Sequence, residues 1–533
     1  MNLLSHLAST IINTDSYKVS HWSQYPEGTE YVSSYIEARN SKYAKELGPE
    51  YDFAEFFGLQ AFIKDYLAKP IEQDDIDLAE LLYEMHGEPF NKEGWQYILD
   101  KHDGKLPVEI RALPEGTVAK TSNAMAEIIN TDPKCYWLTS YVETALLRAV
   151  WYPTTVATKS RILKEITRDF MEGTSDEPAA AIDFMLQDFG ARGVSSMESS
   201  GLGGMAHIVN YKGTDTVMGL VASLGYYNKD FDKFLEETPD KPKRAMIKLL
   251  KKMKEEGTPL PAFSVEASEH STMTIQGREG EKEQIKRLID KAKEGRIVSI
   301  VSDSYDHFHN VMNVFGDEFK EDILEAGRKG GRVVIRPDSG DPVDVIVKTL
   351  EILDEKFGTT VNSKGYKVLP PAVRVLQGDG IDMDSMRDIL QAVKDKGFSA
   401  ENLVFGMGGG LEQKVNRDDL SFAQKASAAC IKGKWYDVFK DPATSSAKQS
   451  KKGRLATIWD GVAFKTIRHA KLKSGQKDQM QVVFRNGEAK NMQTWDNVCS
   501  IAEYFTNLIR KPPTTPVPDP WAKATAKPQG MAA

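Results

Sequence analysis

The chain has 533 residues, of which 41% are hydrophobic and 27% charged, and its formal net charge is −8. This length allows a large core in one multilayer unit or in two to three domains. The acidic balance disfavours a bulk nucleic-acid binder, so an anionic substrate would need locally clustered arginine and lysine. We find no apolar run long enough for a membrane span and no signal peptide. We therefore expect a cytoplasmic protein that binds neither membrane nor nucleic acid.

The three cysteines, Cys135, Cys430 and Cys499, are far apart and include no CxxC pair. This spacing argues against a zinc site or a disulfide framework. They are expected to be buried or idle thiols.

The first 150 residues mix helical and strand patterns. We expect helices at Ile76–Met85 and Leu138–Val150 and a strand at Val108–Ala112, which together indicate an α+β arrangement. Further on, the charged segment Asp230–Gly257 predicts a solvated helical excursion. The alternative interpretation is that the basic face of this segment contacts nucleic acid.

The middle of the chain repeats a strand, a polar loop and a helix about every 30 to 40 residues, which is typical of βα units and a parallel sheet. Helices are expected at Val343–Phe357 and Ser385–Lys396. In such sheets the loops after the strands gather at one edge, where ligands bind. The predicted strands are Ile297–Val301, Arg332–Ile335, Val373–Leu376 and Leu403–Phe405.

Glycine and basic side chains in and near these loops indicate phosphate binding. The run Gly408-Gly409-Gly410 lets backbone amides approach a phosphate, although a structural turn is the alternative. Arg192, Arg336 and Arg417 suit bidentate phosphate recognition, with ordinary salt bridges as the alternative. With Lys414, Lys425 and the loop Ser450–Arg454, they are candidates for a basic pocket.

Three aspartates follow predicted strands or the loops after them: Asp303, Asp338 and Asp379. Their carboxylates can accept hydrogen bonds from sugar hydroxyls or hold Mg²⁺ through water. Helix N-capping is an equal alternative. His270 stands beside Glu269 and two hydroxyl residues, so it is a candidate proton or phosphoryl acceptor, although an isolated histidine is more often structural.

Seven motifs in this order resemble those of the nicotinamide phosphoribosyltransferases, which are type II phosphoribosyltransferases. The resemblance covers about residues 10 to 505, so chance agreement is negligible. The motifs are DSYK at 15–18, DFGARGVSS at 188–196, GTDT at 213–216, EHST at 269–272, IRPDSG at 335–340, QGDG at 377–380 and GGG at 408–410.

The resemblance implies an α/β fold, an irregular α/β barrel of the type II phosphoribosyltransferase kind with an additional α+β domain. Residues 1–180 would form the α+β domain with an N-terminal interface segment, and residues 181–417 the catalytic barrel. Residues 418–505 would complete the α+β domain, and the Pro-rich end, residues 506–533, would be a disordered tail.

The reaction implied joins nicotinamide to phosphoribosyl pyrophosphate and releases pyrophosphate, in NAD salvage. Mg²⁺ is the implied cofactor, with no direct ligands assigned, and ATP hydrolysis would be coupled through a phosphohistidine at His270. The family assembles as a homodimer with each site shared between subunits.

The resemblance also assigns substrate contacts. Phe189 and the partner's Tyr17 would stack on the nicotinamide ring, and Asp215 would accept a hydrogen bond from the carboxamide. Asp338 and Asp379 would hold the ribose hydroxyls, and Gly378 would allow close approach. The phosphate contacts implied are Gly408, Gly409 and Arg417 for the 5′-phosphate, and Arg192, Arg336, His270, Arg39 and Lys425 for the pyrophosphate.

Three other interpretations stay open. A nicotinate phosphoribosyltransferase would share the fold and the donor, but the Asp215 carboxylate would repel the anionic nicotinate. An interaction-only relative without activity and a generic sugar-phosphate barrel enzyme are the others.

Overall fold

The computed structural model describes residues 7–41, 52–441 and 450–524. The chain divides into two compact units, each built from separate stretches of sequence. The first unit comprises Met1–Thr158, Ser223–Lys251 and Val415–Ala533, and the second comprises Lys159–Ala222 and Lys252–Lys414.

The boundaries differ from those expected at residues 180 and 417. The second unit begins earlier, at Lys159, and residues Ser223–Lys251 belong to the first unit rather than to the barrel. Three of the four boundaries between the units fall within helices, namely α7 (Glu143–Thr174), α10 (Val217–Tyr226) and α12 (Pro242–Glu256).

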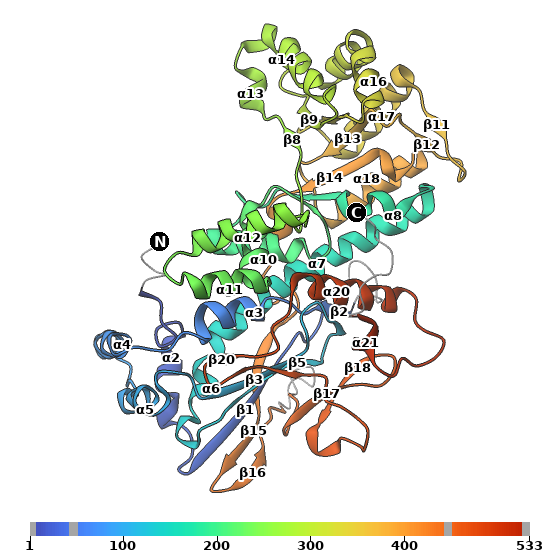
Figure 1. Cartoon of the computed structure of the whole chain (residues 1–533). Coiled ribbons are helices and arrows are strands. Elements are labelled where there is room, and N and C mark those ends of the chain that lie inside the picture. Colours follow the sequence, from blue (N-terminus) through green and yellow to red (C-terminus); the bar gives the residue numbers. More distant parts are fainter. Residues whose placement is uncertain (1–6, 42–51, 442–449, 525–533) are drawn as a thin grey trace. The chain divides into compact units, whose positions relative to one another are not determined.

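An antiparallel seven-stranded sheet is the framework of the first unit, and β1 and β15 pair along most of their length (Figure 1). Two further strand pairs are β2 (Phe53–Glu55) with β4 (Val118–Lys120) and β17 (Leu455–Trp459) with β18 (Phe464–Arg468). The strands of the large sheet, in spatial order, are β16 (Lys434–Asp437), β15 (Ala423–Ile431), β1 (Thr29–Glu37), β5 (Ala124–Asn130), β3 (Val108–Ala112), β19 (Gln481–Arg485) and β20 (Glu488–Ala489).

Helices and an aromatic core complete the first unit. Fully buried Trp95 packs edge-on against Trp137 and Tyr141, with ring centroids 4.9 and 5.0 Å away. The helices are α2 (Ser16–Val19), η1 (His21–Ser23), α3 (Leu59–Phe62), η4 (Ile63–Leu67), α4 (Gln73–His86), α5 (Lys92–His102), η5 (Pro133–Cys135), α6 (Leu138–Tyr141), α11 (Lys229–Glu237), η10 (His469–Lys471), α20 (Trp495–Arg510) and α21 (Pro520–Ala524).

The sequence identifies several of these elements because their end signals are local. The strand expected at Val108–Ala112 is β3, and the helix expected at Ile76–Met85 is α4. Helix α4 begins with a reciprocal capping box between Glu72 and Asp75 and ends at Gly87, which has a left-handed backbone. The charged segment is helical as expected, forming α11 and α12.

The expectation of a disordered tail from residue 506 is wrong for residues 506–524. Helix α20 continues to Arg510, and α21 follows. Both tryptophans nearby are hydrogen-bonded, since Trp459 Nε1 donates to the Val517 carbonyl at 2.7 Å and Trp521 Nε1 donates to Gln479 at 2.5 Å. Aromatic packing therefore outweighs the proline-rich composition here. Residues 525–533 lie outside the described residues.

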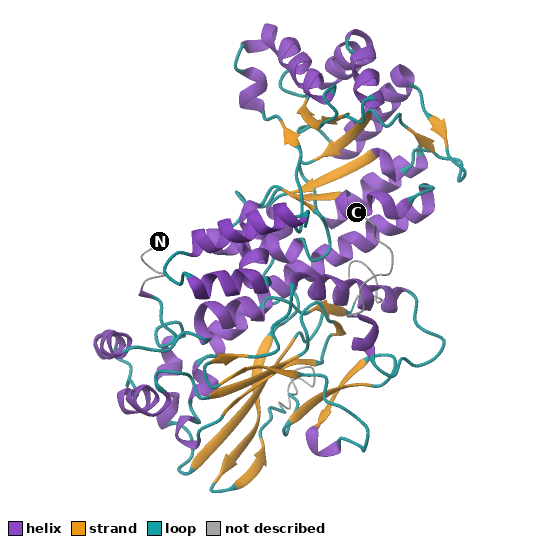
Figure 2. Cartoon of the chain, viewed as in Figure 1, coloured by secondary structure: helices purple, strands orange, loops and turns teal. Residues whose placement is uncertain are grey.

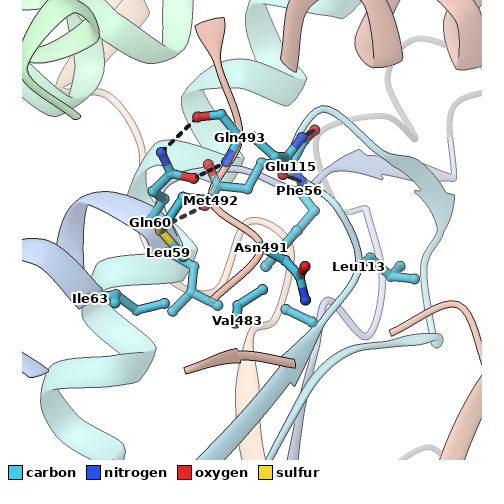
Figure 3. Close-up of a pocket in the computed structure, with 11 residues that line it drawn as sticks. Phe56, Leu59, Gln60, Ile63, Leu113, Glu115, Val483, Asn491, Met492 and Gln493 are labelled. Atoms are coloured by element: carbon cyan, nitrogen blue, oxygen red, sulfur yellow. Dashed lines mark hydrogen bonds between the residues drawn. The ribbon is translucent and has the colours of Figure 1, made fainter. Parts of the chain in front are cut away.

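A small pocket lies in the first unit near α3 (Figure 3). Gln60 and Gln493 exchange hydrogen bonds beside it, because the Gln60 side chain accepts from the Gln493 amide at 2.8 Å and donates to the Gln493 carbonyl at 3.0 Å. The buried Glu115 carboxylate accepts the Gln60 amide at 2.6 Å. None of the site residues predicted from the sequence lines this pocket.

A parallel sheet of seven strands is the framework of the second unit, and its middle strands β13 and β14 are almost entirely buried. All six pairings between neighbouring strands are parallel. The strands, in spatial order, are β7 (Gly213–Thr214), β6 (Leu186–Asp188), β14 (Leu403–Met407), β13 (Val373–Gln377), β10 (Arg332–Arg336), β9 (Ile297–Val301) and β8 (Glu266–Ala267).

One short segment links the two ends of this sheet. Phe263 forms a parallel bridge to Gly213 and accepts the Thr214 amide at 3.0 Å, whereas Glu266 and Ala267, a few residues on, pair with β9. The sheet is therefore closed into an irregular barrel, as the resemblance implies.

Helices lie beside these strands, as expected for βα units (Figure 2). Helices α17 and α18 match the two predicted, and each begins at an aspartate cap, Asp341 and Asp382. The helices are α8 (Pro178–Ala181), η6 (Ile182–Phe184), α9 (Met197–His207), α13 (His270–Thr274), α14 (Gly277–Ala292), α15 (His307–His309), η7 (Asn310–Glu318), α16 (Lys320–Arg328), α17 (Pro342–Phe357), α18 (Met383–Asp395), η8 (Ala400–Asn402) and α19 (Gly409–Glu412), with the strand pair β11 (Thr360–Val361) and β12 (Lys367–Val368).

Among the described helices, none combines the length and the apolar character that crossing a membrane requires.

Candidate active site

The predicted site residues of the second unit follow the carboxyl ends of its parallel strands. Asp215 comes after β7, Asp303 after β9, Asp338 after β10 and Asp379 after β13, while Gly408 follows β14. Because the strands are parallel, these ends lie at one edge of the barrel, which is where barrel enzymes bind ligands.

Asp303 is the centre of a hydrogen-bonded group at this edge. Its Oδ1 lies 3.0 Å from Nε2 of His270. Its Oδ2 accepts the Ser339 hydroxyl at 2.5 Å and the Asp338 amide at 3.1 Å. Burial alone would raise the pKa of Asp303, but the hydrogen bonds from Ser339, His270 and the Asp338 amide lower it. Asp303 is thus an ionised anchor for the loop after β10 and for the His270 ring.

Asp338 has a more open carboxylate. Burial raises its pKa, and Asp303 and Asp379 raise it further, whereas Arg336 and His270 lower it. Oδ2 of Asp338 lies 3.9 Å from Nδ1 of His270. Asp338 therefore interacts electrostatically with Asp303 and Asp379, the aspartates that follow two other strands of the sheet.

The N-cap interpretation of these aspartates is excluded by the helices themselves. Asp341 caps α17 by accepting the amides of Val343 and Asp344, and Asp382 caps α18 by accepting that of Ser385. Asp338 and Asp379 each precede the capping residue by three positions. Their side chains are therefore available to a ligand.

Arg336 ends β10 and reaches across to β8. Its Nη2 donates to the Ser268 carbonyl at 2.6 Å, whereas its buried Nε has no partner among the described residues. Its charge also lowers the pKa of Asp215 and of Asp338. A guanidinium held by one nitrogen and otherwise free suits an anion with several oxygens.

Phe189 presents an aromatic ring at the same edge. Its amide donates to the Met407 carbonyl at 2.9 Å, which fixes the start of its loop to the end of β14. A Cβ atom added at Gly406 would overlap the ring, and one added at Gly378 would lie 3.3 Å from it. Two glycines thus make room for the phenyl group.

Asp215 stands beside Phe189's loop and is accessible to solvent. Partial burial raises the pKa of its carboxyl, and nearby Asp188 adds to this, whereas the Ser264 hydroxyl and Arg336 lower it. Ser264 donates a short hydrogen bond to Oδ1 of Asp215. The side chain can accept a further hydrogen bond from a ligand amide.

The glycine turn after β14 packs against the loop that carries Arg192. A Cβ atom at Gly193 would lie 3.0 Å from the backbone of Gly409, so this close approach of the two loops requires a glycine at position 193. Gly409 begins the short helix α19. Arg192 is exposed beside this contact, as a phosphate ligand would be.

The first unit contains the other four predicted residues, and two of them, Arg39 and Lys425, belong to a cationic cluster at β15 and the segments near it. Lys425 lies opposite Tyr35 in the sheet. Burial lowers the pKa of Lys425, and Arg39, Lys440 and Lys451 lower it further, while Glu37 raises it. Lys425 is thus close enough to Lys451 for their charges to interact, whereas Arg192, Arg336 and Lys414 belong to the second unit. The basic pocket as a whole stays a prediction.

Arg417 and Tyr17 are more peripheral in the first unit. Arg417 is exposed, and its Nη2 lies 3.6 Å from Oδ1 of Asp418. The Ser421 carbonyl, four residues on, accepts Nε of Arg39 at 2.8 Å. The Tyr17 ring is 55% exposed and packs edge-on against His21. A surface tyrosine of this kind is suited to contact another molecule.

No metal-binding geometry appears at the barrel edge within the described ranges. The one convergent group of three His, Cys, Asp or Glu side chains there is His102, Asp132 and Cys135, in the first unit. Asp132 is already engaged by His102 at 2.9 Å and by the Tyr97 hydroxyl at 3.0 Å. That group is accounted for as a hydrogen-bonded network.

Sequence reasoning missed several residues of the site. Ser339 lies within the IRPDSG motif and Ser264 lies five residues before the EHST motif, but neither was assigned a contact. Asp188 and Glu412 are completely buried behind the Phe189 loop, and nothing in their local sequence indicates that they meet.

Comparison with known proteins agrees with this geometry. Residues 184–488 match the nicotinate phosphoribosyltransferase (NAPRTase) family, and residues 9–110 match the N-terminal domain of nicotinamide phosphoribosyltransferase. A nicotinamide phosphoribosyltransferase from Xanthomonas campestris is 43% identical, covering 95% of this chain and 98% of that protein. One from Acinetobacter baylyi is 32% identical, covering 91% of this chain and 95% of that protein.

A solved structure supports the fold independently. The nicotinate-nucleotide pyrophosphorylase of Pyrococcus furiosus superimposes with a TM-score of 0.53 at 13% identity, over 94% of this chain and 96% of that one. Fold, site and relatives together define an enzyme with the type II phosphoribosyltransferase architecture. The chain belongs to the nicotinate phosphoribosyltransferase family.

Proposed function

We propose that this enzyme transfers the phosphoribosyl group of phosphoribosyl pyrophosphate to nicotinamide, giving nicotinamide mononucleotide and pyrophosphate in NAD salvage. The observation that carries the proposal is the group of Asp215, Arg336, Asp338 and Asp379 beside the Phe189 ring, at the edge of a closed parallel barrel. The names of the relatives support the choice of base.

Each part of the substrates has a matching group. The Phe189 ring stacks on nicotinamide, and Asp215 accepts its carboxamide N–H. Asp338 and Asp379 accept the ribose hydroxyls, and Gly378 keeps the approach open. The 5′-phosphate is assigned to Gly408, Gly409 and Arg417, and the pyrophosphate to Arg192 and Arg336.

Catalysis then depends on stabilising the charges that develop in the transition state. Breaking the bond from C1′ to the pyrophosphate oxygen leaves positive charge on the ribose and negative charge on the leaving group. The Asp338 and Asp379 carboxylates face the first, and the arginines face the second. The stacked ring positions its nitrogen, which needs no deprotonation, for attack. Mg²⁺ fits a site with so few convergent protein ligands, because it binds largely through substrate phosphates and water, and it would neutralise the departing charge.

The homodimer is part of the proposal. Tyr17, Arg39 and Lys425 of one subunit are assigned to the site of its partner, Tyr17 against the second face of the ring and the two cations against pyrophosphate. The exposure of Tyr17 and the gathering of Arg39, Lys425 and Lys451 with Glu37 as counter-charge support this assignment.

The choice of base is tested by supplying the purified enzyme with phosphoribosyl pyrophosphate, Mg²⁺ and either nicotinamide or nicotinate. We expect nicotinamide to be the better substrate. Asp215→Asn is expected to lower kcat/KM for nicotinamide about 10-fold or more and to narrow its preference over nicotinate, because a carboxylate that repels nicotinate is removed. A wild-type enzyme that prefers nicotinate would refute the role of Asp215.

ATP coupling is tested at His270, which we assign as phosphoryl acceptor. If Nε2 donates to the Asp303 carboxylate, Nδ1 keeps its lone pair and can attack the γ-phosphorus while ADP leaves. His270→Ala is expected to abolish stimulation by ATP and to retain basal synthesis, measured as nicotinamide mononucleotide formed with and without ATP. Equal stimulation in the variant would contradict the assignment.

A further inference from the structure

Two buried acids lie between the ring-binding loop and the glycine turn. Asp188 ends β6 and directly precedes Phe189, while Glu412 ends α19, the helix that Gly409 begins. Both side chains have zero exposure to solvent. Neither forms an ion pair among the described residues, which is unusual because a buried charge is costly without a partner.

Gly190 packs against both carboxyl groups. Its amide donates to Oδ1 of Asp188 at 2.7 Å, and a Cβ atom added there would lie 2.7 Å from Cδ of Glu412 and 2.9 Å from Oδ1 of Asp188. Oδ2 of Asp188 accepts the Thr214 hydroxyl at 3.2 Å. Asp188 thus has two donors, whereas neither carboxyl oxygen of Glu412 has a donor among the described residues.

The surroundings favour a neutral Glu412. Burial raises its pKa to about 10, with Asp188 as the second cause through charge and hydrogen bonding. The neighbours of Asp188 supply no positive charge, because burial lowers the pKa of the enclosed His207 and Asp215 is itself an acid. A proton on Glu412 gives it a donor that Asp188 can accept.

We propose that Glu412 and Asp188 share one proton in a buried carboxyl–carboxylate hydrogen bond, and that this bond fastens the Phe189–Gly190 loop to the Gly408–Glu412 turn. The proposal rests on the proposed function, in which that loop binds the base and that turn binds the 5′-phosphate. Glu412 is then a positioning residue, since it touches neither substrate and sets the distance between two binding elements.

Two substitutions separate the hydrogen bond from mere packing. Glu412→Gln keeps the size and donates an N–H to Asp188, as the protonated acid does. Glu412→Leu keeps most of the volume and removes the donor, leaving Asp188 without its partner. We expect kcat/KM within about 2-fold of wild type for Gln at neutral pH. For Leu we expect KM for both substrates to rise about 10-fold or more, the size of one charge-assisted hydrogen bond.

The pH dependence has a definite sign. In the wild type the proton leaves as pH rises toward about 10, so activity is lost on that side, and Glu412→Gln should remove that alkaline loss. The unfolded chain releases the same proton near the ordinary value of 4.5. The melting temperature of wild type should therefore fall relative to Glu412→Gln as pH rises between these values.

Infrared spectroscopy observes the proton without any substrate. Wild type should show a protonated-carboxyl C=O band at neutral pH that is absent in Glu412→Gln. Glu281→Gln is the matched control, because Glu281 is a similarly buried glutamate on α14, away from this pair, and its replacement should leave the band and the kinetics unchanged.

Two results would overturn the proposal: a band that persists in Glu412→Gln, or a Gln variant as impaired as Leu with the alkaline loss retained. If Glu412→Leu does not fold, the Gln variant decides alone. The infrared and melting experiments use no substrate, so they distinguish failure of this pair from failure of the proposed reaction.

Discussion

Replacing Asp338 with asparagine is expected to lower kcat/KM for phosphoribosyl pyrophosphate about 100-fold. The variant loses an acceptor of ribose hydroxyls and a negative charge beside the carbon that becomes positive. A hydrogen bond to a charged group contributes up to about 3 kcal/mol, which corresponds to that factor. Steady-state kinetics with the phosphoribosyl donor varied at saturating nicotinamide measures the effect.

Asp341→Asn is the control for this substitution. Asp341 lies three residues further along the same loop, where it caps α17, and asparagine caps helices equally well. We expect its activity and stability to match wild type. Equal losses in Asp338→Asn and Asp341→Asn would indicate a general disturbance of the loop and contradict the assigned role.

The acid side of the pH profile follows from the same carboxyl group. Burial, with Asp303 and Asp379, raises the pKa of Asp338. The ionised form is the active one, so activity is present above this pKa and declines as pH falls through it. We expect the decline to begin at a higher pH than an ordinary aspartate would give, and the Asp338→Asn variant to lack it.

Replacing Gly406 with alanine is expected to displace the Phe189 ring. The added Cβ would overlap the ring while β14 is held by strands on both sides. Overpacking of this kind costs about 1–3 kcal/mol. We expect a lower melting temperature and a KM for nicotinamide raised about 10-fold or more, because the ring can no longer stack on the base.

A double variant separates the clash from the lost stacking. Phe189→Ala should recover the melting temperature of Gly406→Ala, since the overlapping atoms are gone, yet it should not recover the KM. Gly201→Ala on α9 is the control, because a Cβ there meets ordinary contacts of 3.6 Å. Additive losses of stability in the double variant would argue that the two residues do not touch.

The sequence predicted the barrel edge well because its signals are local. Alternation of short apolar strands with polar loops located β9, β10, β13 and β14 to within two residues at their ends. Parallel pairing then implied that Asp303, Asp338 and Asp379 would gather, and they do. The N-cap alternative could be excluded only by the structure, in which Asp341 and Asp382 are the residues that cap α17 and α18.

What the sequence could not reveal depends on long-range contacts. Glu412 and Asp188 lie close together although they are more than two hundred residues apart in the sequence. No spacing rule connects the end of a helix with a strand so much earlier in the chain. The assignment of Ser223–Lys251 to the first unit likewise depends on its packing partners. The order of residues 511–524 depends on aromatic contacts that composition does not encode.

The pairing of β1 with β15 has a consequence for the nascent chain. Ser33 of β1 lies opposite Ala428 of β15. The backbone groups along this edge of β1 therefore cannot form their hydrogen bonds to β15 until most of the protein has been synthesised. An unpaired strand edge invites association with other chains. This edge of β1 therefore stays unpaired with β15 for most of translation, a period in which protection by a chaperone would have the greatest effect on yield.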